Sequence, residues 1–147
     1  MTQGSREAIT RLMNEYCYRI DAGDLEGFAA LFEHGSFGIL GDPAGPDVGK
    51  AAVLETLQNV ILYDGKPRTK HVMSNVQIDV DGSGNEASAQ CYITVFQAVP
   101  RDFPMQPIFG GHYRDRFVKG ADGWQFAQRE ISPDLVGDLS RHRADMA

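Results

Sequence analysis

The hydrophobic period of the chain changes near Thr69. Before this residue, apolar side chains recur at intervals of three and four residues, which is the spacing of amphipathic helices. After it, apolar and polar residues alternate over long stretches, as in β-strands with one buried face. Helices followed by strands predict an α+β fold, in which the helices lie at one side of a mainly antiparallel sheet.

Three helices are expected before Thr69. The first begins near Arg6, with Ser5 as its N-cap, and its apolar stripe consists of Ile9, Leu12, Met13, Tyr16 and Ile20. Gly23 is expected to end this helix and Asp24 to cap the second, which carries its own stripe as far as Phe32. A short strand over residues 36–40 and a third helix over residues 48–63 complete this half.

Four long strands are expected after the change of period. They cover residues 69–80, 87–99, 108–119 and 124–133, with turn residues at 81–85 and around Asp122-Gly123. The second has apolar residues on both faces, which predicts a central position in the sheet. Residues 100–107 contain three prolines and are expected to form a loop. We expect a single domain over residues 1–147, with a core at about 6–133 and a tail at 134–147.

Composition excludes several classes of function. The net charge of −6 and the scattered Lys and Arg residues argue against a nucleic-acid surface. Cys17 and Cys91 lack metal-type spacing, and the four histidines are too dispersed for a zinc site. No stretch has the length and apolar character of a membrane span, and the N-terminus lacks an apolar leader segment, so a cytoplasmic protein without membrane contact is expected.

Two residues stand out as candidates for acid–base chemistry. Asp21 lies at the last turn of the first helix, where the helix dipole disfavours a negative charge, so its carboxylate needs a partner. His71, fifty residues on, is the best candidate. Each residue also has an ordinary explanation: a helix-end carboxylate paired with solvent or a nearby cation, and a hydrogen-bonded or exposed strand histidine. Spacing alone does not join the two.

Arg129 is a third candidate, in the last strand. Strict alternation places its side chain on the face opposite Trp124 and Phe126. This position is consistent with an exposed strand arginine, and also with a buried cation that binds an anion or polarises a substrate oxygen. The alternating pattern does not choose between them.

Several motifs in this order resemble the SnoaL-like branch of the nuclear-transport-factor-2-like superfamily. They are Tyr16-x-x-x-x-Asp21-x-Gly-Asp24, His71-x-x-x-Asn75, Gly111-x-Tyr113-x-Asp115 and Asp122-Gly-Trp124-x-Phe126-x-x-Arg129. Together they span nearly the whole chain. The resemblance implies a cone-shaped fold in which a curved, mixed or antiparallel sheet wraps over three N-terminal helices and encloses a deep apolar pocket.

Within this superfamily the chain looks most like lyases that use an Asp–His dyad, namely scytalone dehydratase, hexachlorocyclohexane dehydrochlorinase and bile-acid dehydratase. Asp21 and His71 match the positions where an aspartate holds a histidine that abstracts a proton. Tyr16 matches a pocket tyrosine of the bile-acid dehydratases, and Arg129 a pocket arginine of the dehydrochlorinases. The resemblance implies a lyase or isomerase that acts on a small, largely apolar cyclic molecule and needs no metal or organic cofactor.

Three further residues are expected to line the pocket: Met73 and Asn75, on the same strand face as His71, and Tyr113. This arrangement leaves an apolar set on the opposite face of the strand, consisting of Val72, Val76, Ile78 and Val80. Either a partner subunit covers that set or a β-bulge reverses the strand. We expect a homodimer, or a higher homo-oligomer, that forms through the sheet.

The same fold also serves proteins without catalytic activity, such as the β subunits of ring-hydroxylating dioxygenases and carriers of small ligands. Co-purification with a large iron–sulfur subunit, or a filled pocket, favours that alternative. A pure scaffold has no need of both Asp21 and His71, so the sequence favours the enzyme.

Overall fold

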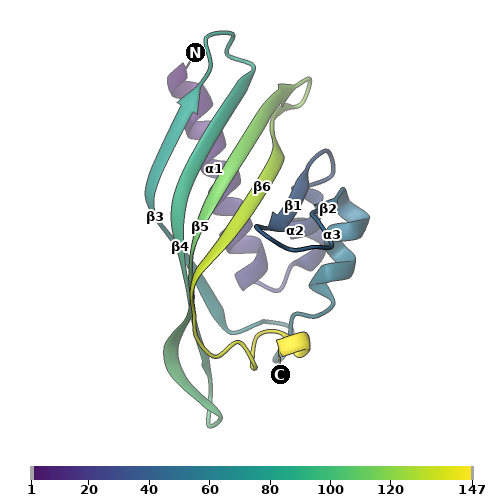
Figure 1. The fold of residues 1–147 in the computed structure, drawn as a ribbon, viewed down its shortest axis with the longest axis vertical. Helices are drawn as coiled ribbons and strands as arrows, with labels where there is room; N and C mark the ends of the chain where they lie inside the picture. The colour runs from purple at the N-terminus through teal and green to yellow at the C-terminus, as the bar shows by residue number, and fades with distance from the viewer. Residues whose placement is uncertain (1, 147) are drawn as a thin grey trace.

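The computed structural model describes residues 2–146 and shows three helices at one side of a six-stranded sheet (Figure 1). The helices are α1 (Thr2–Asp21), α2 (Leu25–Ala30) and α3 (Lys50–Leu57). The strands are β1 (Ser36–Ile39), β2 (Asp47–Val48), β3 (Thr69–Val80), β4 (Glu86–Val99), β5 (Phe103–Gly120) and β6 (Gly123–Val136). A short 3₁₀-helix, η1 (Ala144–Met146), follows β6.

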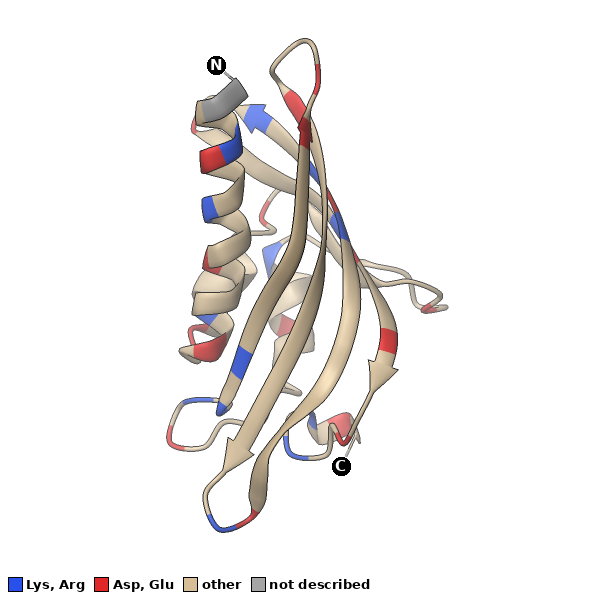
Figure 2. Cartoon of the chain, turned by 90° about the vertical axis from the view of Figure 1, so that its left-hand side faces the viewer, with Lys and Arg blue, Asp and Glu red and all other residues tan. Residues whose placement is uncertain are grey.

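The sheet has the strand order β2-β1-β6-β5-β4-β3. It is mixed, because β1 runs parallel to β6 while the other neighbours are antiparallel. The helices lie on one side of the long strands, and the opposite face of these strands is uncovered in the view of Figure 2. The predicted α+β architecture is therefore confirmed. No helix within residues 2–146 is both long and apolar enough to cross a membrane.

The core forms between α1 and the inner face of the sheet. The predicted stripe of α1 is buried, with Ile9, Met13, Tyr16 and Ile20 each at most 3% exposed. Strand β4 occupies the predicted interior position, between β3 and β5, and alternate residues from Ala87 to Val99 are buried. Its other face is open rather than covered. Alternation therefore continues through the whole strand.

Strand β3 carries a β-bulge between Ser74 and Gln77. These residues pair with Tyr92 and Gln90 of β4, so two residues of β3 oppose a single residue of β4. One of the two is Asn75, which has a φ of 55°. Because the bulge adds one residue to the strand, side chains on either side of it change faces.

The bulge explains how His71 faces inward. Alternation placed Val72, Val76, Ile78 and Val80 together on the face opposite His71. In the structure only Val72 and Val76 point outward, at 46% and 41% exposure, whereas Ile78 is buried in the core and Val80 packs against it. The bulge therefore accounts for an inward His71 without a partner subunit.

Strand β6 carries a second bulge, which corrects the position predicted for Arg129. The register of β6 against β5 shifts by one residue at Ala127. Trp124, Phe126 and Arg129 are all buried as a result. The prediction from strict alternation, that Arg129 lies on the face opposite the two aromatic residues, is wrong because it assumed a regular strand.

Two predicted boundaries also shift near the N-terminus and in the third helix. Helix α1 already begins at Thr2, so Ser5 is a buried residue within the helix and not its cap. Helix α3 stops at Leu57, because Val60 forms a β-bridge to Arg143 in the C-terminal segment. Asp24 does cap α2 as expected, and its carboxylate accepts a hydrogen bond from the backbone N–H of Gly27 at 2.9 Å.

Strand β5 begins at Phe103, inside the segment predicted to be a proline loop. Pro104 and Pro107 lie within the strand. Pairing with β6 begins only at Phe109, so this extension pairs with β4 alone and has a free edge. Proline is tolerated at a sheet edge because no neighbour requires its missing N–H.

Candidate active site

A cavity of about 470 Å³ opens between the inner face of the sheet, the helices and the C-terminal segment. Its wall is largely apolar and aromatic, and every long strand contributes to it. The residues that matter for its chemistry are His71 of β3, Tyr113 of β5, Tyr16 of α1 and His142 of the C-terminal segment. Apolar lining comes from Ile20, Phe28, Phe37, Leu57, Val95, Phe109, Ile131 and Leu139.

Asp21 and His71 touch at this wall. The Nδ1 atom of His71 lies 2.7 Å from Oδ1 of Asp21, and the two side chains are 7% and 11% exposed respectively. The backbone N–H of His71 donates to Oδ2 of Asp21 at 2.8 Å, and the Thr69 hydroxyl donates to Oδ1 at 2.7 Å. Three hydrogen bonds from the start of β3 therefore fix the carboxylate at the end of α1.

The electrostatics keep Asp21 ionised. Burial alone would raise the pKa of Asp21, but hydrogen bonds and charge attraction from His71, together with the Thr69 hydroxyl, outweigh burial and lower it. An ionised carboxylate can only accept, so whenever the His71 ring is neutral its protonated nitrogen is Nδ1. Its Nε2 is then the nitrogen with a free lone pair, on a side chain that lines the cavity.

Tyr16 and Tyr113 form a second polar pair in the cavity wall. Their hydroxyl oxygens lie 3.0 Å apart, and the Tyr16 ring contacts the His71 ring edge-on, with the ring centroids 6.3 Å apart. Burial raises the pKa of both tyrosines well above the ordinary value. Both hydroxyls therefore stay protonated at neutral pH and can donate a hydrogen bond.

Arg129 lies behind this pair and does not line the cavity. Its Nε and Nη2 atoms donate to the two carboxylate oxygens of Asp115 at 2.7 and 2.8 Å, and both side chains are fully buried. Its guanidinium stacks 4.3 Å from the ring centroids of Tyr16 and Tyr113. Burial would lower the pKa of Arg129, but the Asp115 carboxylate outweighs burial and raises it. Arg129 was predicted to contact the substrate, but in the structure it packs against the two tyrosine rings instead.

Two of the three predicted pocket residues also lie elsewhere. Asn75 is exposed at the bulge of β3, and Met73 packs partly buried against the core outside the cavity wall. Asn75 was assigned from an unbroken alternation that begins at His71, and the bulge interrupts that alternation. Met73 lies before the bulge and does point inward, but its side chain packs against the core. Tyr113 does line the cavity, as predicted.

The C-terminal segment supplies lining residues that the sequence did not indicate. The chain after β6 turns back across the cavity, and its main chain bonds the segment that follows α3: Ile61 N–H donates to the His142 carbonyl at 2.9 Å. Figure 1 shows this segment beside α3. The residues of this segment are largely polar and charged, as in a frayed tail, so no sequence pattern indicated that His142 lines a cavity.

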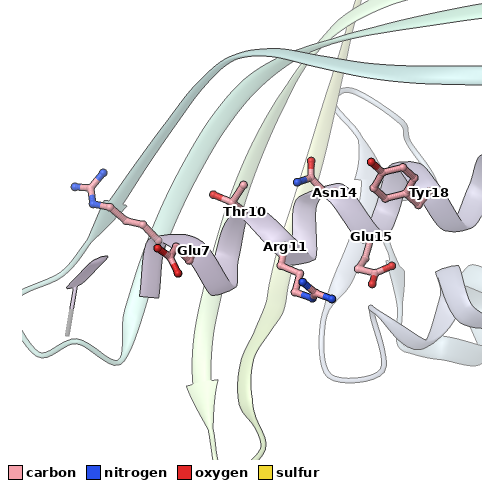
Figure 3. A pocket seen from close by; sticks show the side chains of 7 residues that line it. Glu7, Thr10, Arg11, Asn14, Glu15 and Tyr18 are labelled. Atoms are coloured by element: carbon pink, nitrogen blue, oxygen red, sulfur yellow. The ribbon is translucent and has the colours of Figure 1, made fainter. Parts of the chain in front are cut away.

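A second hollow, of about 550 Å³, lies on the polar face of α1 (Figure 3). All of its lining side chains come from that one helix: Arg6, Glu7, Thr10, Arg11, Asn14, Glu15 and Tyr18. It is more open than the cavity at His71. The apolar cavity at His71, where buried polar groups converge, is therefore the candidate site.

These features define a class of protein: a cystatin-like α+β fold, in which a curved sheet and three helices surround a cavity with an Asp–His pair in its wall. The profile of the SnoaL-like domain matches residues 3–130. The chain therefore belongs to the SnoaL-like domain family.

Solved structures agree with this assignment. A candidate scytalone dehydratase from Novosphingobium aromaticivorans is 27% identical, with 93% of this chain and 89% of that chain covered and a TM-score of 0.74. A Mycobacterium tuberculosis protein of unknown function is 28% identical over 90% of this chain and 73% of that one, with a TM-score of 0.69. A nuclear-transport-factor-2-like protein with a cystatin-like fold, also from N. aromaticivorans, is 23% identical over 90% and 83%, with a TM-score of 0.74. No functionally curated protein matches the sequence.

Proposed function

We propose that this protein is a lyase or isomerase in which His71 abstracts a proton from a small, largely apolar cyclic substrate. The observation that carries the proposal is the 2.7 Å contact between His71 Nδ1 and Asp21 Oδ1 in the wall of the cavity. The likeness to a candidate scytalone dehydratase, at 27% identity, supports the same reaction class.

The arrangement suits a general base. Asp21 holds the His71 ring in the tautomer that leaves Nε2 unprotonated, and its negative charge stabilises the imidazolium that forms when Nε2 accepts a proton. A positioned base of this kind typically contributes about 10²–10⁴-fold in rate. Substrate binding in an apolar cavity removes water, which strengthens the attraction between imidazolium and carboxylate.

The tyrosine pair suits the other half of the reaction. When a proton leaves carbon, negative charge develops on a neighbouring oxygen or on a leaving group. The Tyr16 and Tyr113 hydroxyls are protonated and lie in the same cavity wall as His71. We propose that one of them donates a hydrogen bond to that developing charge.

Proton abstraction can be tested without the natural substrate. Nitrobenzisoxazole is a flat bicyclic probe: loss of its ring C–H proton to a base breaks the N–O bond and releases a coloured phenolate. We expect the wild type to accelerate this elimination and His71→Ala to lose about 10²–10⁴-fold of the acceleration. His34→Ala is the matched control, because His34 is exposed and outside the cavity. Equal acceleration by wild type and His71→Ala would refute the proposal.

The alternative is a ligand-binding or non-catalytic subunit of the same fold. A candidate aromatic ring hydroxylase from N. aromaticivorans shares the fold at 23% identity and a TM-score of 0.74, a likeness that extends to the fold alone. The buried Asp21–His71 pair favours the enzyme, since a ligand carrier does not need an oriented base. Wild-type protein that binds aromatic compounds yet gives no acceleration above the His71→Ala level would favour the carrier.

We also propose that the protein forms a homodimer through the outer face of the sheet. Val72, Val76 and Tyr92 lie on this face and are 46%, 41% and 51% exposed. Apolar side chains grouped on an open sheet face favour contact with a second copy. Sedimentation equilibrium should give twice the chain mass for the wild type and the monomer mass for Val72→Lys. A monomeric wild type at micromolar concentration would refute the dimer.

A further inference from the structure

His142 is a second histidine in the cavity wall, and the proposed reaction does not yet use it. Its ring centroid lies 6.2 Å from that of His71, with the ring planes at 62°. The residue lines the same cavity. Within residues 2–146, its Nδ1 is buried and has no hydrogen-bond partner. A buried polar atom without a partner calls for an explanation, and a bound ligand is one of them.

The main chain around His142 is held firmly. The carbonyl of Arg141 accepts hydrogen bonds from the Tyr63 hydroxyl at 2.6 Å and from the Gln97 side chain at 3.0 Å. On the other side of His142, the N–H of Ala144 donates to the Asn59 carbonyl at 2.7 Å. The His142 ring therefore projects from a fixed backbone, as a group that positions a ligand must.

His142 is also in a protonation state in which its ring can either donate to a substrate oxygen or accept from a substrate hydroxyl. Burial lowers its pKa to about 4, and the neighbouring His71 and Arg143 act in the same direction, against a smaller opposite effect of Asp21. At neutral pH the ring is uncharged, so one nitrogen donates and the other accepts. Because His142 is neutral and a weak base, the proton that His71 abstracts from the substrate carbon stays on His71, beside Asp21.

We propose that His142 is a substrate-contacting residue, whose ring nitrogen pairs with an oxygen of the substrate while His71 acts on a C–H bond elsewhere on the same molecule. The substrate class is thereby narrowed to apolar cyclic molecules that carry a carbonyl or hydroxyl oxygen about one ring's width from the acidic C–H. The inference rests on the proposed function for the role of His71, but the contact itself concerns binding.

A pair of matched ligands tests the contact without turnover. β-Tetralone and tetralin share two fused rings, and only the ketone carries an oxygen. We expect wild-type protein to bind β-tetralone about tenfold more tightly than tetralin at pH 7, as one neutral hydrogen bond allows. His142→Phe should lose this preference, because phenylalanine fills the space without a polar atom. His142→Asn, which keeps a polar group near the position of Nδ1, should retain part of it.

Other outcomes overturn the inference. If His142→Phe still prefers β-tetralone over tetralin, another group binds the oxygen. If only His71→Phe loses this preference, the Asp21–His71 pair makes the contact. A wild type that binds both ligands equally, or neither, also refutes the contact. The proposed function itself is tested separately, by the rate of nitrobenzisoxazole elimination. NMR titration of labelled protein gives each Kd and reports at the same time whether each variant is folded.

Discussion

The buried ion pair between Arg129 and Asp115 gives the sharpest prediction about stability. Two hydrogen bonds of 2.7 and 2.8 Å join the side chains, and neither side chain is exposed. Asp115→Asn removes the negative charge and keeps the shape, so a guanidinium stays buried without its counter-charge. Breaking a buried pair in this way typically costs about 3–5 kcal/mol. Against a total stability of about 5–15 kcal/mol, this is a large loss.

Removal of both charges should be less harmful than removal of one. The double variant Asp115→Leu with Arg129→Met leaves no unpaired charge, and we expect it to be more stable than Asp115→Asn. The two tyrosines would still lose the cation that lies 4.3 Å from their ring centroids. The double variant should therefore fold well and yet accelerate the nitrobenzisoxazole elimination less than the wild type.

Urea unfolding followed by the fluorescence of Trp124, the single tryptophan, measures both variants. A loss below about 1 kcal/mol in Asp115→Asn, the range of exposed ion pairs, would refute the reasoning. A double variant no more stable than the single one would also refute it, since the unpaired charge would then not be the cause.

Two further predictions concern the cavity. Asp21→Asn should lower the rate of nitrobenzisoxazole elimination nearly as far as His71→Ala, because an amide no longer fixes the tautomer of the base; a rate within twofold of wild type contradicts this. The folded-state pKa of His142 is about 4 and the unfolded value about 6.5, so the unfolded chain binds more protons between them. The free energy of unfolding of the wild type should therefore fall by up to about 3 kcal/mol from pH 6.5 to pH 4 relative to that of His142→Phe. Urea unfolding at each pH measures both proteins, and an equal change in the two would contradict the prediction.

The long elements were predictable because their periods persist over many residues. The stripe of α1 and the alternation of β4 follow from packing against one side of each element, and the structure confirms both. The α+β order needs nothing more than the change of period near Thr69. Ends of elements were less predictable, because pairing with distant segments decides them. Helix α3 ends early where Val60 pairs with Arg143, which is far away in the sequence.

The two bulges were the main source of error, since each adds a single residue and then reverses every assignment beyond it. Around Ala127 a signal was present: Trp124 and Phe126 occupy even positions, whereas the next large apolar residue, Ile131, occupies an odd one. A change of phase within one strand indicates a bulge, and it would have placed Arg129 inward. Around Asn75 the apolar residues kept one phase, so the sequence contained no such signal.

The candidate site was predictable only in part. The position of Asp21 at a helix end indicated that it needs a partner, and the family resemblance identified His71 as that partner. In the structure, the pairing register of β3 and its bulge allow the two side chains to touch. His142 had no signal, because a segment without period gives no direction for its side chains. Its position depends on main-chain bonds to the residues after α3, which pattern analysis does not reach.

The structure arranges its ionisable groups in two layers, and this arrangement favours a base over a nucleophile. The deeper layer is the Arg129–Asp115 pair, whose charges cancel and whose cation packs under the rings of Tyr16 and Tyr113. The outer layer is His71, held by an ionised Asp21 at the cavity wall. In the proposed reaction, a proton that leaves carbon converts His71 to a cation beside a carboxylate, and a protonated tyrosine hydroxyl donates to the charge left on the substrate. A covalent mechanism would require an activated nucleophile, and burial raises the pKa of the nearby Cys17 thiol to about 12, which opposes that role.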